Sequence, residues 1–346
     1  MLYIHQSYCI SPQQTFQQVN IELLNKSAGN KMLAIEPGYE GVPPGTLRRM
    51  GKAIRMGVGA AMPIIKNSAD VNGIIIGTAN GGMEDCIKFL NQIVQYEEGL
   101  LAPGNFVQST SNAIAAQIGL LSSNKSYNTT HVHRGLAFEN AIIDAIMQIR
   151  QHLGRSYLLG GVDEVSSFNY NIENLSGAYK KEDAGNLNLY DTESTGSIAG
   201  EAAAMFLVNN KEENAVARLQ GMQLLHSEDE LLVKEKLSEF IESYLPAGEK
   251  INLFLTGENG DNRTLKFYTA CESLLDEDIA VARFKHMCGE YPTASSFGLW
   301  IAVQILQLQQ IPNHLYKKKR NKGDFKNILL YNNFKGRQHS FMLLSV

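Results

Sequence analysis

The sequence predicts an α/β fold, and two observations carry that prediction. Short apolar runs of strand length alternate with longer segments of helical periodicity along most of the 346 residues. Within this pattern, Tyr127–Val165 reads as a strand, a sharp turn, a buried helix and a buried strand. The composition, 44% hydrophobic and 19% charged, is that of an ordinary globular protein with one large domain or two modest ones.

The helix expected at Gly135–Arg150 is the centre of this stretch. It is mostly apolar, and its polar breaks lie about four residues apart, which predicts one narrow polar stripe: Glu139, Asn140, Asp144 and Gln148. Ser156–Leu159, closed by Gly160 and Gly161, is typical of a strand buried on both faces. A turn that opens a buried helix is where α/β enzymes place a nucleophile, because the helix dipole favours negative charge there.

The segments before this stretch continue the alternation. Strands are expected within Met1–Ala34 and at Val71–Ile76, and a helix of small residues is expected within Asn105–Leu121. Another helix begins at about Leu47 and carries basic side chains. These either form a solvated face or dock an acidic partner: Arg48, Arg49, Lys52 and Arg55.

The segments after it repeat the pattern. A polar loop is expected at Ser176–Gly196, a strand pair at Gly196–Val208, and a junction between two halves at Asn209–Asn214. Strands are then expected at Ala215–Leu225, Ile251–Leu255, Ile279–Phe284, Asn327–Tyr331 and Ser340–Leu344, and helices at Ser227–Tyr244, Asn262–Leu275 and Thr293–Gln310.

Charge and cysteine usage exclude several classes of protein. A net charge of −4 gives no reason to expect nucleic acid as a partner. The four cysteines are scattered without disulfide or metal spacing, which suits a reducing compartment. The N-terminus lacks the pattern of a signal peptide, and the longest apolar runs are too short to cross a bilayer. We therefore expect a cytoplasmic protein without a membrane segment.

Several motifs together resemble the β-ketoacyl synthases (3-oxoacyl-ACP synthases) of the thiolase superfamily. They are the central stretch that ends at Gly160 and Gly161, the segment GSIAGEAAAMFLV at Gly196–Val208, and the closing YNNFKGRQHSFMLL, in which Lys335 interrupts the usual glycines. The resemblance implies a thiolase-like, five-layer αβαβα fold with two pseudo-repeated halves, residues 1–208 and 209–346.

The resemblance also implies where the catalytic residues of the family would stand. Counting back from Gly160 places the nucleophilic cysteine at Gly135, or within one or two residues at Arg134 or His133. The two catalytic histidines correspond to Thr256 and Glu290. All three positions have therefore changed, and a carboxylate at Glu290 would oppose enolate formation. The sequence predicts that the Cys-His-His condensation chemistry is lost.

The motifs THVHRGLAFENA and CGEYPTAS resemble, more narrowly, a synthase-like subunit of aryl polyene and flexirubin-type pathways. The resemblance implies a chain-length factor that pairs with an active ketosynthase, with a homodimer as the other possibility, and that works with an acyl carrier protein. The alternative is a non-canonical acyltransferase or synthase acting on acyl carrier protein with relocated catalytic residues. No cofactor is expected under either interpretation.

Some of these residues have rival interpretations. His131 and His133 form a His-x-His pair that can bind metal on a strand, but no further ligand is evident, so we expect no metal and a structural role. We expect Arg134 to pair with Glu139 or Glu290. Cys288 and His286 would share a face of a strand as a displaced nucleophile pair, although a plain buried cysteine is the simpler interpretation.

The remaining candidates complete the predicted pocket. Lys285, Glu290 and Thr256 are the alternative residues for thioester hydrolysis, without a recognisable nucleophile and base. Phe138, Glu258 and Phe334 are further candidate pocket residues. A basic run is expected to be a solvated loop or a docking patch for an acidic carrier protein or the partner subunit: Lys317, Lys318, Lys319, Arg320 and Lys322.

Overall fold

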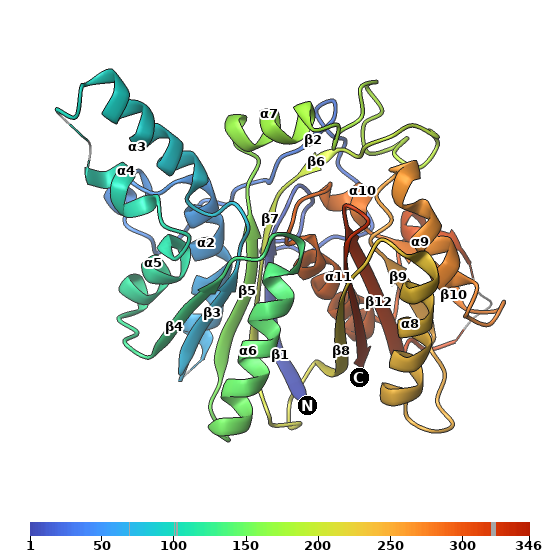
Figure 1. Ribbon diagram of the computed structural model, residues 1–346. Coiled ribbons are helices and arrows are strands. Elements are labelled where there is room, and N and C mark those ends of the chain that lie inside the picture. Colours follow the sequence, from blue (N-terminus) through green and yellow to red (C-terminus); the bar gives the residue numbers. More distant parts are fainter. Residues whose placement is uncertain (69, 100, 102, 320–322) are drawn as a thin grey trace.

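The computed structural model describes residues 1–68, 70–99, 101, 103–319 and 323–346, which form five layers (Figure 1). Helices form the two outer layers, strands lie inside them, and helices α6 and α11 occupy the centre. Three large clusters of buried apolar side chains fill the spaces between the layers. The largest surrounds the central helices, and the other two lie under the outer ones. The predicted thiolase-like αβαβα fold is confirmed.

The strands of the first half lie in the order β4-β3-β5-β7-β1. The first three are parallel, and β7 and β1 are antiparallel to their neighbours. Their bounds are Leu2–Ile10 (β1), Gly73–Gly77 (β3), Tyr127–His131 (β4), Tyr157–Asp163 (β5) and Ala202–Asn209 (β7).

The second half has the same arrangement, β10-β9-β12-β13-β8, again with three parallel strands followed by two antiparallel ones. Numbered along the chain, both halves read 3-2-4-5-1. The topology therefore shows a duplication that is not visible as a sequence repeat. The bounds are Ala217–His226 (β8), Leu253–Thr256 (β9), Ala280–Arg283 (β10), Asn327–Phe334 (β12) and Gln338–Ser345 (β13).

The two halves share one core and one sheet. Leu2, Tyr3 and Ile4 of β1 pair with Leu219, Arg218 and Ala217 of β8, which makes a continuous eleven-stranded sheet. The strand β11 (Tyr316–Lys318) adds to the far edge, and β2 (Lys31–Met32) pairs separately with β6 (Ala199–Gly200). The boundary at 208/209 stays a prediction, and β7 ends at Asn209.

The helices follow the same duplication. The equivalent central helices are α6 (Ala137–Gln151) and α11 (Ala294–Leu308), and α11 is buried along most of its length because its sequence, ASSFGLWIAVQILQL, is almost wholly apolar or small. The outer layers hold α2 (Lys52–Asn67) and α5 (Ala113–Ser122) on one side, and α8 (Glu230–Tyr244) and α9 (Asn262–Glu272) on the other. The other helices are α1 (Pro44–Leu47), α3 (Met83–Gln95), α4 (Pro103–Gln108), α7 (Ser167–Leu175) and α10 (Lys285–Cys288), with single 3-10 turns at Arg134–Leu136 and Asn313–Leu315. Across the part of the chain that the structure describes, no helix combines the length and apolar character needed to cross a membrane.

The structure differs from the predicted elements at a few places. The basic helix begins at Lys52, because Gly51 is its N-cap, and the helix expected within Asn105–Leu121 is broken into α4 and α5. The helix α7 was not predicted; it begins at a capping box in which Ser166 and Asn169 bond each other's backbone. The predicted stripe on α6 is also only partly correct, since Glu139 is fully buried and accepts a hydrogen bond from Ser340.

Asp163, the last residue of β5, joins the two halves. Its buried carboxylate accepts hydrogen bonds from the Thr78 hydroxyl (3.1 Å) and from the backbone N–H groups of Ala79 (3.0 Å) and Asn80 (2.8 Å). Its other oxygen accepts from the backbone N–H and the hydroxyl of Thr293, at 3.2 and 2.8 Å. Because Thr293 is the N-cap of α11, one side chain fixes the turn after β3 to the start of the central helix of the other half.

Replacing Asp163 with alanine should lower the free energy of unfolding by about 3 kcal/mol or more, because five buried donors lose their acceptor. Urea unfolding followed by circular dichroism measures this. The exposed Asp278→Ala is the matched control and should change stability by less than about 0.5 kcal/mol. Similar losses in the two variants would contradict the joining role of Asp163.

Candidate functional site

A cleft of about 860 Å³ lies where the start of α6, the loop after β9 and the β12–β13 turn meet. Among the predicted site residues, Arg134, Glu290 and Phe334 line it. The others lie behind its wall or away from it: His131, His133, Gly135, Phe138, Thr256, Glu258, Lys285 and Cys288. The cleft is therefore at the place that the resemblance implies, but few of the predicted residues face into it.

Gly135, which the resemblance aligns with the nucleophile, has no room for a side chain. A Cβ atom added there would lie 2.2 Å from Cβ of Phe334 and 2.5 Å from Cγ of the same residue. Phe334 is itself almost fully buried, at 6% exposure, so it cannot move aside freely. The space that a nucleophilic side chain would need is filled by an aromatic ring.

The backbone N–H of Gly135 is also occupied. It donates a 2.9 Å hydrogen bond to Oε1 of Gln338, the first residue of β13. An N–H group at the start of a buried helix is the kind of donor that stabilises an oxyanion. Here a side-chain amide oxygen from the same chain takes that bond, so the donor is not available to a substrate.

Glu290 and Thr256 are both bound within the protein. The Glu290 carboxylate pairs with the ammonium group of fully buried Lys285 (2.8 Å), and its second oxygen accepts from the Asn259 amide (2.7 Å). Thr256, at the end of β9, donates its hydroxyl to the carbonyl of Ala282 (3.2 Å). The two positions that the resemblance aligns with histidines thus hold an ion pair and a strand contact, and neither presents a neutral N–H donor to the cleft.

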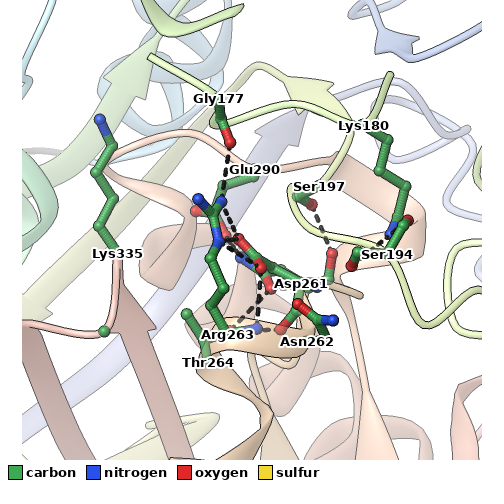
Figure 2. A network of polar contacts seen from close by, with 12 residues as sticks. Gly177, Lys180, Ser194, Ser197, Asp261, Asn262, Arg263, Thr264, Glu290 and Lys335 are labelled. Carbon is green, nitrogen blue, oxygen red and sulfur yellow. Dashed lines mark hydrogen bonds and ion pairs between the residues drawn. The ribbon is translucent and has the colours of Figure 1, made fainter. Parts of the chain in front are cut away.

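A polar network holds this side of the cleft in place (Figure 2). Arg263 bonds the carboxylate of Asp261 and donates to the carbonyl of Gly177 at 2.9 Å. The buried Ser197 hydroxyl donates to the carbonyl of Asn259 (2.6 Å), and Lys180 donates to the carbonyl of Gly260 (2.8 Å). The polar loop that follows α7 is therefore tied to the segment that carries the Glu290 partner.

The histidines of the predicted His-x-His pair contact α6. His131 is the last residue of β4, and its Nε2 lies 2.9 Å from the carboxylate of Asp144. His133 lies beyond the strand, and its Nδ1 accepts from the Asn140 amide at 2.8 Å. The expectation that both lie on one strand was wrong, because the chain turns at residue 134. Within the described ranges, no group of three or more side chains that could hold a metal ion gathers.

The expected pairing of Arg134 was also wrong. Its backbone has a φ of +48° and its side chain is exposed at the cleft, whereas Glu290 is bound by Lys285 and Asn259. Glu139 instead accepts from Ser340, and its other oxygen has no hydrogen-bond partner within the described residues. Among the described residues, neither Glu139 nor Glu290 forms an ion pair with Arg134.

Cys288 and His286 do not form a nucleophile pair. They lie on the short helix α10 rather than on a strand, so side chains two residues apart do not share a face. Burial raises the pKa of the Cys288 thiol, which disfavours the reactive thiolate. The nearby Phe138 is likewise a core residue, packed on Phe206 at 5.9 Å between ring centroids.

His286 belongs to a buried chain of hydrogen bonds. Nε2 of His314 donates to the carbonyl of Ile21 (2.9 Å), so its Nδ1 accepts from Nε2 of His286 (2.9 Å). Nδ1 of His286 then faces the Tyr190 hydroxyl at 3.4 Å. Burial, with the nearby His314 and Arg283, lowers the pKa of His286 to about 3. This chain of bonds fastens the segment after β1 to the second half while both rings are neutral.

Three of the basic residues that were considered as docking surfaces are held in ion pairs. Glu258 forms ion pairs with Arg283 (3.1 Å) and Lys317 (2.7 Å). Lys317, the first residue of the basic run, is therefore bound within the chain. Lys52 pairs with buried Glu201, and Arg55 pairs with Glu36 at 2.8 Å. The exposed cations that remain are Arg48 and Arg49 before α2, Lys318 on β11, and Lys319 just after it, which donates to the Asn313 side chain at 2.9 Å. Arg320 and Lys322 lie outside the described residues.

The sequence did not indicate Gln338 and Asn259, although both complete the altered site. Asn259 lies in TGENGD, where glycine and asparagine indicate a tight turn and thus a residue held close to the end of β9. Gln338 follows the glycine of the β12–β13 turn, and no local pattern marks it. Only the pairing of β12 with β13 brings it to Gly135.

Comparison with known proteins also points to the fold of the β-ketoacyl synthases. A sequence profile described as the β-ketoacyl synthase N-terminal domain matches residues 26–175. No curated protein sequence is significantly similar to the chain.

Solved structures resemble the whole chain. A β-ketoacyl synthase from Burkholderia phymatum has a TM-score of 0.76 at 12% identity, with 99% of this chain and 98% of that chain covered. The ishigamide ketosynthase/chain length factor has a TM-score of 0.77 at 14% identity, covering 100% and 99%. A ketosynthase in complex with its chain length factor from Xenorhabdus doucetiae has a TM-score of 0.73 at 11% identity, covering 100% and 98%. The chain therefore has the thiolase-like ketosynthase fold.

Replacing Gly135 with cysteine should destabilise the protein by about 1–3 kcal/mol, because the new side chain overlaps Phe334. The same change made in a Phe334→Ala background should cost much less. A double-mutant cycle by urea unfolding measures this coupling. Gly38→Cys, where nothing lies within 4 Å, is the steric control. If Gly135→Cys destabilises the protein equally with and without Phe334→Ala, then Phe334 does not fill the volume next to Gly135.

The free energy of unfolding should fall by a few kcal/mol as the pH drops from about 6.5 to 3, because the folded state resists protonation of His286 while the unfolded chain accepts it. His339, whose pKa burial lowers to about 4, adds to the same trend. Urea unfolding at several pH values measures the slope. His286→Phe should reduce the slope of unfolding free energy against pH between pH 6.5 and 3. An unchanged slope in this variant would show that His286 is not the source of the pH dependence.

Proposed function

We propose that this chain is a non-condensing subunit, of the chain-length-factor type, that pairs with an active ketosynthase in fatty acid or polyketide biosynthesis, and in particular in polyene-forming pathways. The observation that carries the proposal is the packing at Gly135. Phe334 fills the volume of a nucleophilic side chain, and Gln338 takes the N–H group that an oxyanion would need.

Decarboxylative condensation also needs neutral donors that stabilise an enolate. The Lys285–Glu290 pair supports the loss of that function, because a carboxylate stands where the enolate charge would develop. Removing either partner would leave a buried charge, so the pair is not easily reversed. The contacts at the three positions support one interpretation, the loss of condensation.

The free edge of β4 is the surface that we assign to the partner synthase. The strand lies at the end of the sheet, and its neighbour on one side only is β3. Exposed apolar side chains flank this edge on both faces, which is unusual for a surface that meets only water. We call them the β4 edge: Leu120, Tyr127, Val132, Ile143 and Met147. Pairing with another thiolase-type edge would cover them and continue the sheet.

The remaining parts of the proposal concern the wider setting. The solved relatives include a carrier protein in complex with its ketosynthase, which supports an acyl carrier protein as the companion of the assembled pair. The exposed Arg48 and Arg49 offer a positive surface for such an acidic partner. The described cysteines are free, as expected in the reducing cytoplasm.

The alternative function, acyl transfer through relocated residues, has weaker support. Cys288 is fully buried with a raised thiol pKa, and its sulfur contacts the Gly289 carbonyl at 3.4 Å. His131 is engaged by Asp144, and Glu290 by Lys285. None of the three is arranged as a nucleophile beside a free base. We therefore keep the partner role as the conclusion.

Intact-mass spectrometry tests this function. The chain is purified from its source cell with the synthase that accompanies it and is incubated with acyl-loaded carrier protein. We expect no acyl adduct on this chain and a stoichiometric adduct on a cysteine-bearing synthase in the same tube. An adduct on this chain, located by peptide mapping, would overturn the proposal and make it an acyltransferase.

The variant Leu120→Asp should no longer co-purify with the partner synthase, because pairing at the β4 edge would bury a carboxylate that has no partner. Leu231→Asp, on an exposed part of α8, is the matched control and should co-purify with the synthase as the unchanged protein does. Analytical ultracentrifugation of both variants shows whether each remains folded and monodisperse. Retained pairing in Leu120→Asp would exclude the β4 edge as the interface.

A further inference from the structure

Residues 83–108 form an arm that projects from the first half of the molecule, and Figure 1 shows it above α5. The arm consists of α3, α4 and the link between them. Thirteen of its 26 residues are apolar, a larger share than the 44% of the whole chain. None of the arm residues that the structure describes is buried. A segment as apolar as this that stays uncovered indicates a surface for another molecule.

The helix α3 has an apolar face that the chain itself does not cover. Ile87, Leu90 and Val94 are three or four residues apart, so they lie on one side of the helix. Leu90 and Val94 are 52% and 80% exposed. The helix α8, of similar length, instead buries three of its residues. Because a helix of about 12–15 residues is only marginally stable in water, α3 would be stabilised by a molecule that covers this face.

The helix α4 extends the same surface. The ring centroids of Phe89 on α3 and Phe106 on α4 are 5.3 Å apart, so the two helices lie side by side. Phe106 and its neighbour Val107 are nevertheless 59% and 67% exposed. We call the exposed apolar side chains of the two helices the arm patch: Leu90, Val94, Phe106 and Val107. The centre of a protein–protein interface has this composition, with aromatic residues and few charges.

The arm is joined to the β4 edge. The helix α5, which carries Leu120 of that edge, begins four residues after the arm ends. Its N-cap, Asn112, accepts a 2.8 Å hydrogen bond from the hydroxyl of Thr130 on β4. Figure 1 shows α3, α4, α5 and β4 along one side of the molecule. A protein that pairs with β4 would therefore lie next to the arm.

The β4 edge by itself is small for a lasting contact. A stable interface buries about 800 Å² and involves about 20–30 residues on each partner. The β4 edge offers five exposed apolar side chains. The arm adds four more, together with the polar residues between them, so the two surfaces combined approach the size of a stable interface.

We propose that the α3–α4 arm is a second contact with the partner ketosynthase, and that the arm patch is covered only in the pair. This inference rests on the function proposed above and extends the contact beyond the β4 edge. The surface of the synthase that receives the arm is apolar, because the patch offers only apolar side chains. Pairing supplies the packing that α3 lacks in the isolated chain.

Hydrogen–deuterium exchange with mass spectrometry tests the proposal on the full chain, alone and paired with the cysteine-bearing synthase. Amides of α3 and α4 should exchange at least tenfold more slowly in the pair, while those of α8 should be unchanged. Protection of β4 without protection of the arm would overturn this proposal and leave the proposed function standing. Absence of pairing would overturn both. A dimer of the isolated chain with a protected arm would assign the arm to a second copy and overturn the proposal as well.

The variant Val94→Asp should raise the Kd for the synthase at least tenfold, because the pair would bury a carboxylate without a partner. The melting temperature of the isolated variant should stay within about 2 °C of the unchanged chain, since Val94 is exposed there. Leu231→Asp on α8 is the matched control, with both values unchanged. Isothermal titration calorimetry and thermal unfolding measure the two quantities. An unchanged Kd in Val94→Asp, or a large loss of melting temperature, would contradict the contact.

Discussion

The carboxylate of Asp163 is the interaction on which the architecture depends. It ends β5 in the first half, and its five hydrogen bonds reach both the turn after β3 and the N-cap of α11 in the second half. Its negative charge lies at the start of a helix, where the dipole stabilises it. Because α6 and α11 form the central layer between the two halves of the large sheet, this contact sets how the two halves meet, and so where the cleft lies.

The groups around Gly135 and Glu290 are satisfied by contacts within the chain. Each change is satisfied locally: a ring packs on Gly135, a side-chain oxygen accepts its N–H, and a lysine neutralises Glu290. Neither the Gly135 N–H nor the Glu290 carboxylate is left without a partner. Under the function proposed above, the protein acts through its surfaces, the β4 edge above all, rather than through a reaction of its own.

Much of the fold could be predicted because it rests on local patterns. Apolar runs with period two or 3.6 gave strands and helices that the structure contains, from Val71–Ile76 to the buried α11. The errors fall where local signals are weak or where the chain turns sharply: α7 depends on a capping box, and α10 on a single helical turn. A one-turn helix has no periodicity to detect, so His286 and Cys288 were placed wrongly on a strand.

The sequence by itself determined the fold class, because residue types and spacing are local properties, and it led to the prediction that the catalytic side chains of the β-ketoacyl synthases are changed here. Only the tertiary structure decided what surrounds Gly135 and Glu290. The contacts of Phe334 and Gln338 with Gly135 join residues about 200 positions apart, and the partner of Glu290 depends on the turn of α10. Contacts between distant segments follow from the pairing of strands and the packing of layers, which no local pattern encodes.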